Sequence, residues 1–242
     1  MSKYLVGLTL STLLSSAPED SISEEKKVHS FPPALFTSFA NEFASDKECT
    51  PLDILFLVDT TSSMGGVFPA MKEEIRGASY EIAKHHTSVR YALSTVGDFP
   101  DRLFSIDIPY NRVRDFSFDP QHIEMGLHFI IPYGGGDIPE AYPYALARAS
   151  EEKWRPNATR MVVLFADSYA KNNVSLKKSV DNANYDLVTV TPPEMCEYWQ
   201  NYSSTNFLLG DDELTKFLME YSTQLCRDQP LVCKANENYF KI

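Results

Sequence analysis

The sequence predicts an α/β domain built on a doubly wound, mainly parallel β-sheet flanked by helices. Two apolar runs, at residues 54–58 and 161–166, continue without alternating polar positions. Such runs are typical of strands that are covered by helices on both faces. Strand-like and helix-like segments also alternate from about residue 51 to residue 226, which is the order that a parallel sheet requires.

The individual elements follow from the spacing of apolar residues and from helix-end signals. Residues 67–85 place apolar side chains on one helical face. Asp119 followed by Pro120 predicts the start of another helix. Further strands are expected at residues 89–96, 103–108, 185–190 and 206–209, and further helices at 119–131, 140–152, 176–183, 194–200 and 211–226.

Length and charge narrow the class of protein. The chain has 242 residues, of which 43% are hydrophobic, enough for one sizeable core. Its net charge is −11, with 33 acidic and 22 basic residues. A protein that follows the phosphates of a nucleic acid would show clustered Lys and Arg, so we expect no nucleic-acid partner.

The amino terminus divides into two expected segments ahead of the main domain. Lys3, an apolar stretch at 4–14 and the small residues Ser15, Ser16 and Ala17 resemble a secretory signal over residues 1–17. An ordinary strand or helix is the alternative. Residues 18–50 form a polar, proline-interrupted linker or extension, 51–226 the domain and 227–242 a tail. The apolar stretch is too short to span a bilayer, so we expect no membrane span.

Cysteines and glycosylation motifs favour a secreted or extracellular protein. Four cysteines suit two disulfides, and three pairings are open. A local Cys226–Cys233 bond leaves Cys49 to pair with Cys196. No CxxC pair appears, so no zinc site is expected. Three Asn-x-Ser/Thr motifs predict a glycoprotein, and they begin at Asn157, Asn173 and Asn201.

The first candidate ligands come directly after the first apolar run. Asp59, Thr61 and Ser63 alternate along the chain and offer one carboxylate and two hydroxyl groups. These hard oxygen ligands suit Mg²⁺ or Mn²⁺ better than Zn²⁺. The alternative is a polar turn in which Asp59 or Ser62 caps the next helix.

Two later segments carry further acids. Three glycines at 134–136 allow close approach of the backbone, and Asp137 and Glu140 follow them. These two acids have an alternative role in complementing the dipole of the following helix. Asp167 ends the run at 161–166, as Asp59 ends the first. Acids at two strand ends are typical of a doubly wound sheet with its site at the carboxyl edge.

These motifs resemble von Willebrand factor A-type domains over roughly residues 51–226. Asp59-x-Thr61-x-Ser63 resembles the first loop of the metal-ion-dependent adhesion site, and Asp167 matches the third loop. Asp137-Ile-Pro-Glu140 is similar to the Asp-x-Pro-Glu of integrin β-subunit I-like domains. The resemblance implies a Mg²⁺ or Mn²⁺ ion at Asp59, Thr61, Ser63 and Asp167, with Glu140 direct or through water.

A second cation is implied by the same resemblance. Residues 97–101, Gly-Asp-Phe-Pro-Asp, are similar to the integrin β loop that supplies an acid to a neighbouring Ca²⁺ site. Asp101 and Asp137, with Glu140 shared, are the implied ligands. The chain departs from the integrin β pattern at residues 65–67, where Gly-Gly-Val replaces paired acids of a further cation site.

The predicted function is binding. A-type domains leave one metal position for an acidic group of a partner protein, so the resemblance implies a metal-dependent adhesion module. No Gly-x-Ser-x-Gly elbow, P-loop or dinucleotide fingerprint is present, and we expect no enzyme. His85 and His86 are expected at the surface. The alternative is an intracellular scaffold or assembly subunit with a structural or vestigial metal site.

Overall fold

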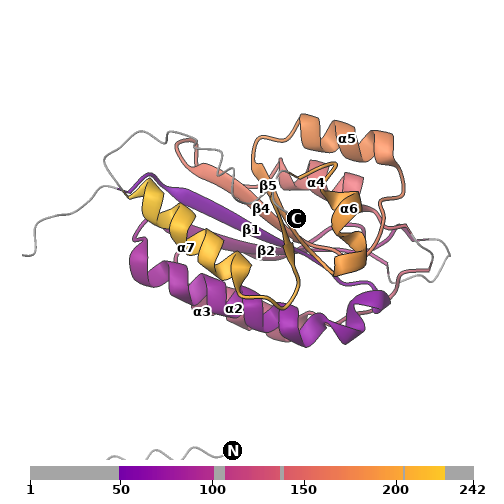
Figure 1. The fold of residues 1–242 in the computed structure, drawn as a ribbon, viewed down its shortest axis with the longest axis horizontal. Coiled ribbons are helices and arrows are strands. Elements are labelled where there is room, and N and C mark those ends of the chain that lie inside the picture. Colours follow the sequence, from indigo (N-terminus) through magenta and orange to yellow (C-terminus); the bar gives the residue numbers. More distant parts are fainter. Residues whose placement is uncertain (1–48, 101–106, 137–138, 204, 227–242) are drawn as a thin grey trace, which may run out of the picture. The chain divides into compact units, whose positions relative to one another are not determined.

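The computed structural model describes residues 49–100, 107–136, 139–203 and 205–226. These residues form a six-stranded sheet in the order β3-β2-β1-β4-β5-β6 (Figure 1). All neighbouring pairs are parallel except β2 and β3. The predicted α/β class is therefore confirmed. The strands are β1 (Leu52–Asp59), β2 (Val89–Val96), β3 (Asn111–Ser117), β4 (Thr159–Phe165), β5 (Asp186–Thr191) and β6 (Thr205–Leu208).

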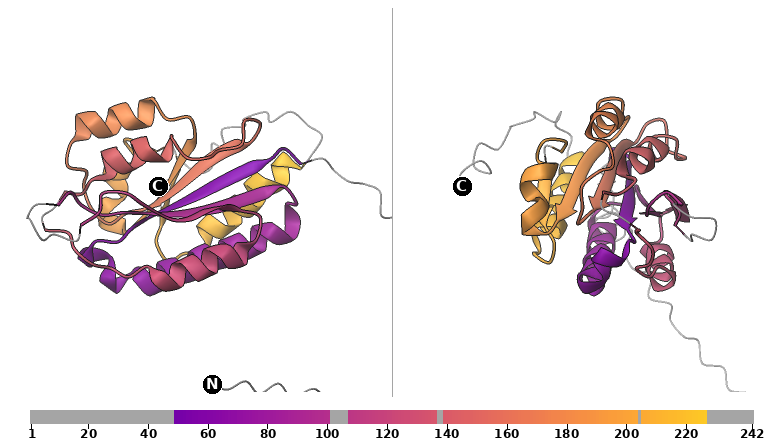
Figure 2. Two further views of the ribbon diagram at one scale, coloured as in Figure 1. Left: turned by 180° about the vertical axis from the view of Figure 1, so that it is seen from behind. Right: turned by 90° about the vertical axis from the view of Figure 1, so that its right-hand side faces the viewer.

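Helices cover both faces of this sheet. Helices α2, α3 and α7 lie on one face, and α4, α5 and α6 lie on the other (Figures 1 and 2). None of the helices in the described ranges is both long and apolar enough to cross a membrane. Their bounds are α2 (Phe68–His85), α3 (Pro120–Phe129), α4 (Tyr142–Ala149), α5 (Asn173–Asp181), α6 (Cys196–Trp199) and α7 (Glu213–Leu225), with 3₁₀ turns η1 (Ser62–Gly66) and η2 (Pro193–Met195).

The central strand β1 explains why its sequence is apolar without interruption. All eight of its residues are buried. Ile54, Phe56 and Val58 belong to the core that also contains residues of α2 and α7, while Leu55 and Leu57 belong to the core shared with α4. Burial of each such side chain contributes roughly 1.5–3 kcal/mol. The strand is thereby fixed, and its last residue, Asp59, is held at the carboxyl edge of the sheet.

The third predicted strand, at residues 103–108, lies mostly outside the described residues. Residues 101–106 are outside the described ranges, and Asp107 and Ile108 are not in a strand. Strand β3 instead begins at Asn111 and pairs antiparallel with β2 at the edge of the sheet. Its sequence, NRVRDFS, contains three charged side chains and stays partly exposed. Charges on an edge strand discourage pairing with other chains, and here they also conceal the strand pattern.

One disulfide joins the two ends of the domain. Cys49, just before β1, is bonded to Cys226, just after α7. The expected pairing of Cys49 with Cys196 is therefore wrong, and Cys196 is a free thiol. Helix α7 returns to the amino edge of the sheet, where Thr50 N donates to Leu225 O at 2.9 Å. Cys233 lies outside the described residues.

Candidate metal centre

The first loop brings its three predicted ligands together. Asp59 Oδ1 accepts hydrogen bonds from Thr61 N and from Thr61 Oγ1, both at 2.7 Å. Ser63 Oγ lies 3.0 Å from Thr61 Oγ1 and donates to Asp167 Oδ1 at 3.1 Å. The first and third predicted loops thus meet at the carboxyl edge of the sheet. Neither η1 nor α2 has a side-chain cap, so the alternative in which Asp59 or Ser62 caps a helix is wrong.

The two hydroxyl groups share an unusual arrangement. Each hydroxyl has one proton and two lone pairs. When Thr61 donates to Asp59 and Ser63 donates to Asp167, neither proton remains for the 3.0 Å contact between the two hydroxyl oxygens. The two hydroxyl oxygens then keep lone pairs that a hard cation could use, beside the carboxylates to which they donate.

Glu140 belongs to the same cluster, although it is not helical as predicted. Helix α4 begins two residues later, and Glu140 instead forms a bridge to Ala170. Glu140 N donates to Tyr169 O, and Glu140 O accepts from Lys171 N, each at 2.8 Å. The side chain is 2% exposed, and Oε2 has no hydrogen-bond partner among the described residues. Burial, together with the charges of nearby acids, raises the pKa of Glu140 to about 8.

The glycine loop passes close to these side chains, as its sequence predicts. Gly134 and Gly135 have φ values of 67° and 75°, a region that favours glycine. A Cβ at Gly135 would lie 3.0 Å from Thr61 Cβ and 3.5 Å from Glu140 Oε1. The backbone is tied to the first loop because Ser62 N donates to Gly134 O at 3.2 Å. A larger residue at position 135 would enter the space between Thr61 and Glu140.

The electrostatics of the cluster favour a cation. Asp59 is fully buried, and this burial raises its pKa to about 6, although hydrogen bonds from Tyr142 and Thr61 act in the opposite direction. Burial also raises the pKa of Asp167. The donor set contains oxygen atoms only, and Glu140 Oε2 is an orphaned acceptor. These residues fit Mg²⁺ or Mn²⁺ better than a metal that prefers nitrogen or sulfur.

Two residues at the site, Tyr142 and Asp98, were not predicted from the sequence to contact or influence the metal-binding acids. Tyr142 is fully buried and its hydroxyl donates to Asp59 Oδ2. Its position two residues after Glu140 is the single sequence signal available. Asp98 is 1% exposed, forms an ion pair with Lys171 at 2.9 Å, and its charge raises the pKa of Glu140. The loop that follows β2 therefore brings Asp98 to the cluster.

The implied Ca²⁺ site falls outside the described residues. Both of its unshared ligands, Asp101 and Asp137, lie in the ranges that the structure does not describe. Only the shared Glu140 is placed. The second cation therefore stays a prediction of the resemblance.

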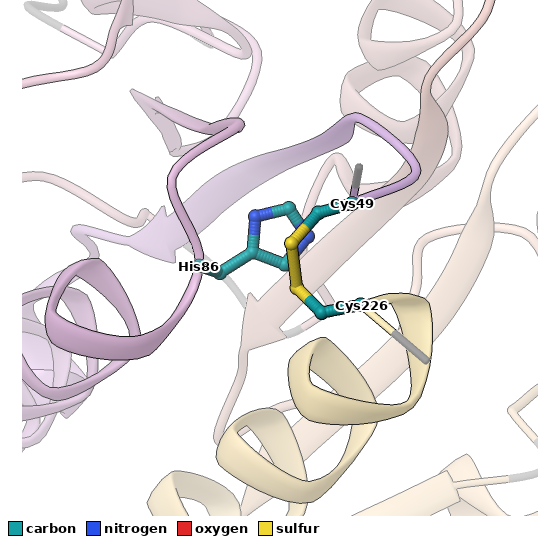
Figure 3. Close-up of side chains that lie close together, drawn as sticks. All are labelled: Cys49, His86 and Cys226. Carbon is teal, nitrogen blue, oxygen red and sulfur yellow. A yellow bond between two sulfur atoms is a disulfide. The ribbon is translucent and has the colours of Figure 1, made fainter. Parts of the chain in front are cut away.

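A second group of metal-type side chains lies near the chain ends. Figure 3 shows Cys49, His86 and Cys226, whose ligand atoms lie within 4.8 Å of one another. The disulfide occupies both sulfur atoms, and His86 Nδ1 accepts from Ser88 N at 3.1 Å. The proton of the neutral imidazole is then on Nε2, so no lone pair is directed at a metal. The oxidised cluster is structural, and His86 is buried, contrary to the expected surface position.

Comparison with known proteins gives distant similarities. No protein-family model matches the sequence. The alpha-protein kinase vwkA of Dictyostelium discoideum is 28% identical over 161 residues, which cover 64% of this chain and 24% of the kinase. This chain therefore spans about a quarter of that relative.

Two solved structures share the fold. Proximal thread matrix protein 1 from the mussel byssus has a TM-score of 0.51 and 15% identity, over 74% of this chain and 49% of that chain. The pilus adhesin SpaC from Lactobacillus rhamnosus GG has a TM-score of 0.54 and 11% identity, over 74% and 31% respectively. At these identities the similarity concerns the fold alone.

Proposed function

We propose that this protein is a metal-dependent adhesion or protein-binding module of the von Willebrand factor A type. Its loop pattern is closest to integrin β-subunit I-like domains. A Mg²⁺ or Mn²⁺ ion binds at the carboxyl edge of the sheet and receives an acidic group from a partner protein. The proposed ligands are Asp59, Thr61, Ser63 and Asp167, with Glu140 direct or through water.

One observation carries this proposal. Thr61 donates to Asp59 and Ser63 donates to Asp167, 104 residues further along the chain, and the two hydroxyl oxygens lie 3.0 Å apart, so the two loops meet at one point. Buried carboxylates that lack a basic partner are unfavourable in a folded protein. A bound divalent cation would neutralise them, and this supports a binding site over an ordinary polar turn.

The surface around the cluster supports a protein as the partner. Phe99 follows Asp98 and is 43% exposed, and its ring packs edge-on against Tyr144 with centroids 5.6 Å apart. Tyr169, whose carbonyl accepts from Glu140 N, is 50% exposed. Exposed aromatic side chains beside a charged centre are typical of protein-binding surfaces. We therefore propose that the incoming acid is flanked by apolar residues.

An extracellular location agrees with this function. Disulfides persist in oxidising compartments, and Cys49 is bonded to Cys226. The two structural neighbours are named as a byssus matrix protein and a pilus adhesin. These points favour a secreted module over an intracellular scaffold. The chain spans only 24% of the kinase that it resembles, so kinase activity is not part of this proposal.

The metal is tested by calorimetric titration of chelator-stripped protein with MgCl₂ and, separately, with MnCl₂. The unmodified chain should bind one ion at this centre, and Asp59→Asn should lose that binding. Asp53→Asn is the matched control, because it makes the same chemical change at the other end of β1. Equal heats from Asp59→Asn and the unmodified chain would refute the proposed site.

The partner chemistry is tested with immobilised peptides that carry one Asp or Glu between apolar residues. Retention should require Mg²⁺ and should disappear with EDTA, with Asp59→Asn, or when the peptide acid becomes an amide. Retention that is indifferent to all three changes would contradict recognition through the metal.

A further inference from the structure

We infer that Asn157 carries an N-linked glycan and that the other two sequence motifs remain unmodified. This inference rests on the proposed secretion, and the exclusion of Asn173 rests also on the proposed binding surface. An Asn-x-Ser/Thr motif is a glycan acceptor in a surface loop of a secreted protein. All three acceptor residues are exposed, and they differ in their side-chain contacts and in their distance along the fold from the candidate metal centre.

Asn157 is free to carry a bulky group. It is exposed, in a turn that precedes β4, and its side chain makes no hydrogen bond to any residue that the structure describes. The chain on its carboxyl side is anchored, because Thr159 N donates to Pro51 O at 2.8 Å. Residue 157 is thus at the amino edge of the sheet, opposite the candidate metal centre, where a glycan leaves the binding surface open.

The protein surface beside Asn157 is polar. Pro156 and Ala158 border a shallow cavity of about 430 Å³ that is also lined by Arg160, Asn184 and Asp186. The side chains of these three residues offer hydrogen-bond donors and acceptors. The first sugars of a glycan on Asn157 can therefore lie against protein that matches their hydroxyl groups.

The side chain of Asn201 forms hydrogen bonds with the protein backbone. Its Nδ2 donates to Glu197 O at 2.9 Å and to Tyr198 O at 3.1 Å, at the carboxyl end of α6. The third residue of its motif, Ser203, is 5% exposed, and its hydroxyl donates to Leu187 O at 2.8 Å. A glycan would replace one of the two Nδ2 protons and break one of these bonds.

Asn173 lies on the side of the molecule that the proposed function needs open. It is the first residue of α5, and its Oδ1 accepts from Tyr198 OH at 2.7 Å. The loop that leads to it contains Ala170 and Lys171, which flank Glu140. A glycan at Asn173 would cover the approach to the candidate metal centre.

The modification is a balanced substitution at one carbon. The co-substrate is an oligosaccharide linked to a polyprenyl diphosphate. Asn157 Nδ2 forms a bond to C1 of the first sugar, and the bond from C1 to the diphosphate oxygen breaks. The diphosphate leaves with the electron pair, and Nδ2 loses one proton. No oxidant or reductant is required.

The inference is tested by expressing the full chain, with its own amino terminus, in eukaryotic secretory cells. Peptide N-glycosidase in ¹⁸O-water converts a glycosylated Asn to labelled Asp, which peptide mass spectrometry locates. We expect label at position 157 alone and a single shift in gel mobility. Asn157→Gln and Thr159→Ala should abolish the shift, whereas Thr159→Ser, which keeps the motif, should retain it.

Other outcomes overturn the inference. These are an unmodified chain in both medium and cells, or label at position 173 or 201. Thr159→Ala answers the question if Asn157→Gln does not fold. Failure here is distinct from failure of the proposed function, because an unglycosylated chain that binds Mg²⁺ refutes only the glycan, and a glycosylated chain that does not bind Mg²⁺ refutes only the metal site.

Discussion

Strand β1 carries a buried aspartate near each end, and the two have opposite electrostatic surroundings. Asp53 and Asp59 are both 0% exposed. Asp53 pairs with Arg90 Nη2 at 2.6 Å and Arg155 Nη2 at 2.8 Å. Burial alone would raise its pKa, but the hydrogen bonds from these arginines lower it below the usual value. Asp59 receives hydrogen bonds only from Thr61 and Tyr142 in the described structure, and burial raises its pKa to about 6.

The pKa values of the two aspartates move in opposite directions because their neighbouring side chains differ, although both residues lie on β1. At the amino edge the protein supplies the cations that a buried carboxylate needs, so the charge stabilises the fold. At the carboxyl edge Asp59 and Asp167 accept hydrogen bonds from hydroxyl groups, and Glu140 Oε2 has no hydrogen-bond partner in the described structure. Among the described residues, no arginine or lysine is paired with any of these three acids. A folded protein keeps such an imbalance chiefly at functional sites.

The largest expected effect comes from removing the compensated charge. Asp53→Asn leaves Arg90 and Arg155 partly buried without an anion, and we expect the free energy of unfolding to fall by about 3 kcal/mol. Asp59→Asn should instead leave the metal-free protein as stable as the unmodified chain or more so, because it relieves repulsion. Urea unfolding of both variants in EDTA measures the contrast.

Equal losses of unfolding free energy in Asp53→Asn and Asp59→Asn would contradict the proposed difference between the two ends of β1. A loss in Asp59→Asn alone would make Asp59 a structural residue, held by Thr61 and Tyr142 for the sake of the fold.

Adding Mg²⁺ should also distinguish Asp53→Asn from Asp59→Asn, with a somewhat smaller effect on stability. At free Mg²⁺ about a hundredfold above its dissociation constant, binding to the folded state alone contributes about 2.7 kcal/mol. Asp53→Asn should gain the full Mg²⁺-dependent increment, although its metal-free stability is lower than that of the unmodified chain. Asp59→Asn should gain none. Thermal melts with and without Mg²⁺ measure the increments. An increment in Asp59→Asn would place the ion elsewhere.

The smallest effect concerns an acid that is only partly buried. Glu74 on α2 faces the turn before α7, and burial, together with Asp211 and Asp212, raises its pKa to about 7. Because its folded pKa lies above the unfolded value, its contribution to stability is present below pH 4.5 and is lost as pH rises through 7. The residue as a whole is partly exposed, so we expect less than about 1 kcal/mol.

Saturating Mg²⁺ isolates Glu74 from the acids of the candidate metal centre. Melting temperatures between pH 5 and pH 8 should decline less for Glu74→Gln than for the unmodified chain. Parallel curves for the two proteins would remove Glu74 as the source of the pH dependence.

The parts of the fold that the sequence predicts are those set by continuous burial. Strands β1 and β4 and helix α3 were located because apolar runs and a capping Asp119 act locally. Strand β3 was missed because a half-exposed edge strand with Arg112, Arg114 and Asp115 has no clear period. The pairing of Cys49 with Cys226 depends on the position of the carboxyl end of α7 in the fold. The spacing of cysteines along the chain does not predict this position.

The candidate site shows the same division. Asp59 ends β1, and Thr61, Ser63 and Asp167 come soon after β1 or β4, so their meeting at one edge could be expected from topology. Tyr142 could not be assigned, because a hydrogen bond from a buried hydroxyl to Asp59 depends on how α4 packs. The raised pKa of Asp59 likewise reflects its surroundings in three dimensions.

The disulfide has a mechanical consequence. The chain continues on both sides of the Cys49–Cys226 bond, and 177 positions of sequence separate the two cysteines. Tension applied to the outer segments therefore passes through one covalent sulfur–sulfur link and bypasses the sheet. The strands and the glycine loop carry no load while that link is intact. This protection applies to tension between the two outer segments, and reduction of that one bond would turn the same domain into an extensible element.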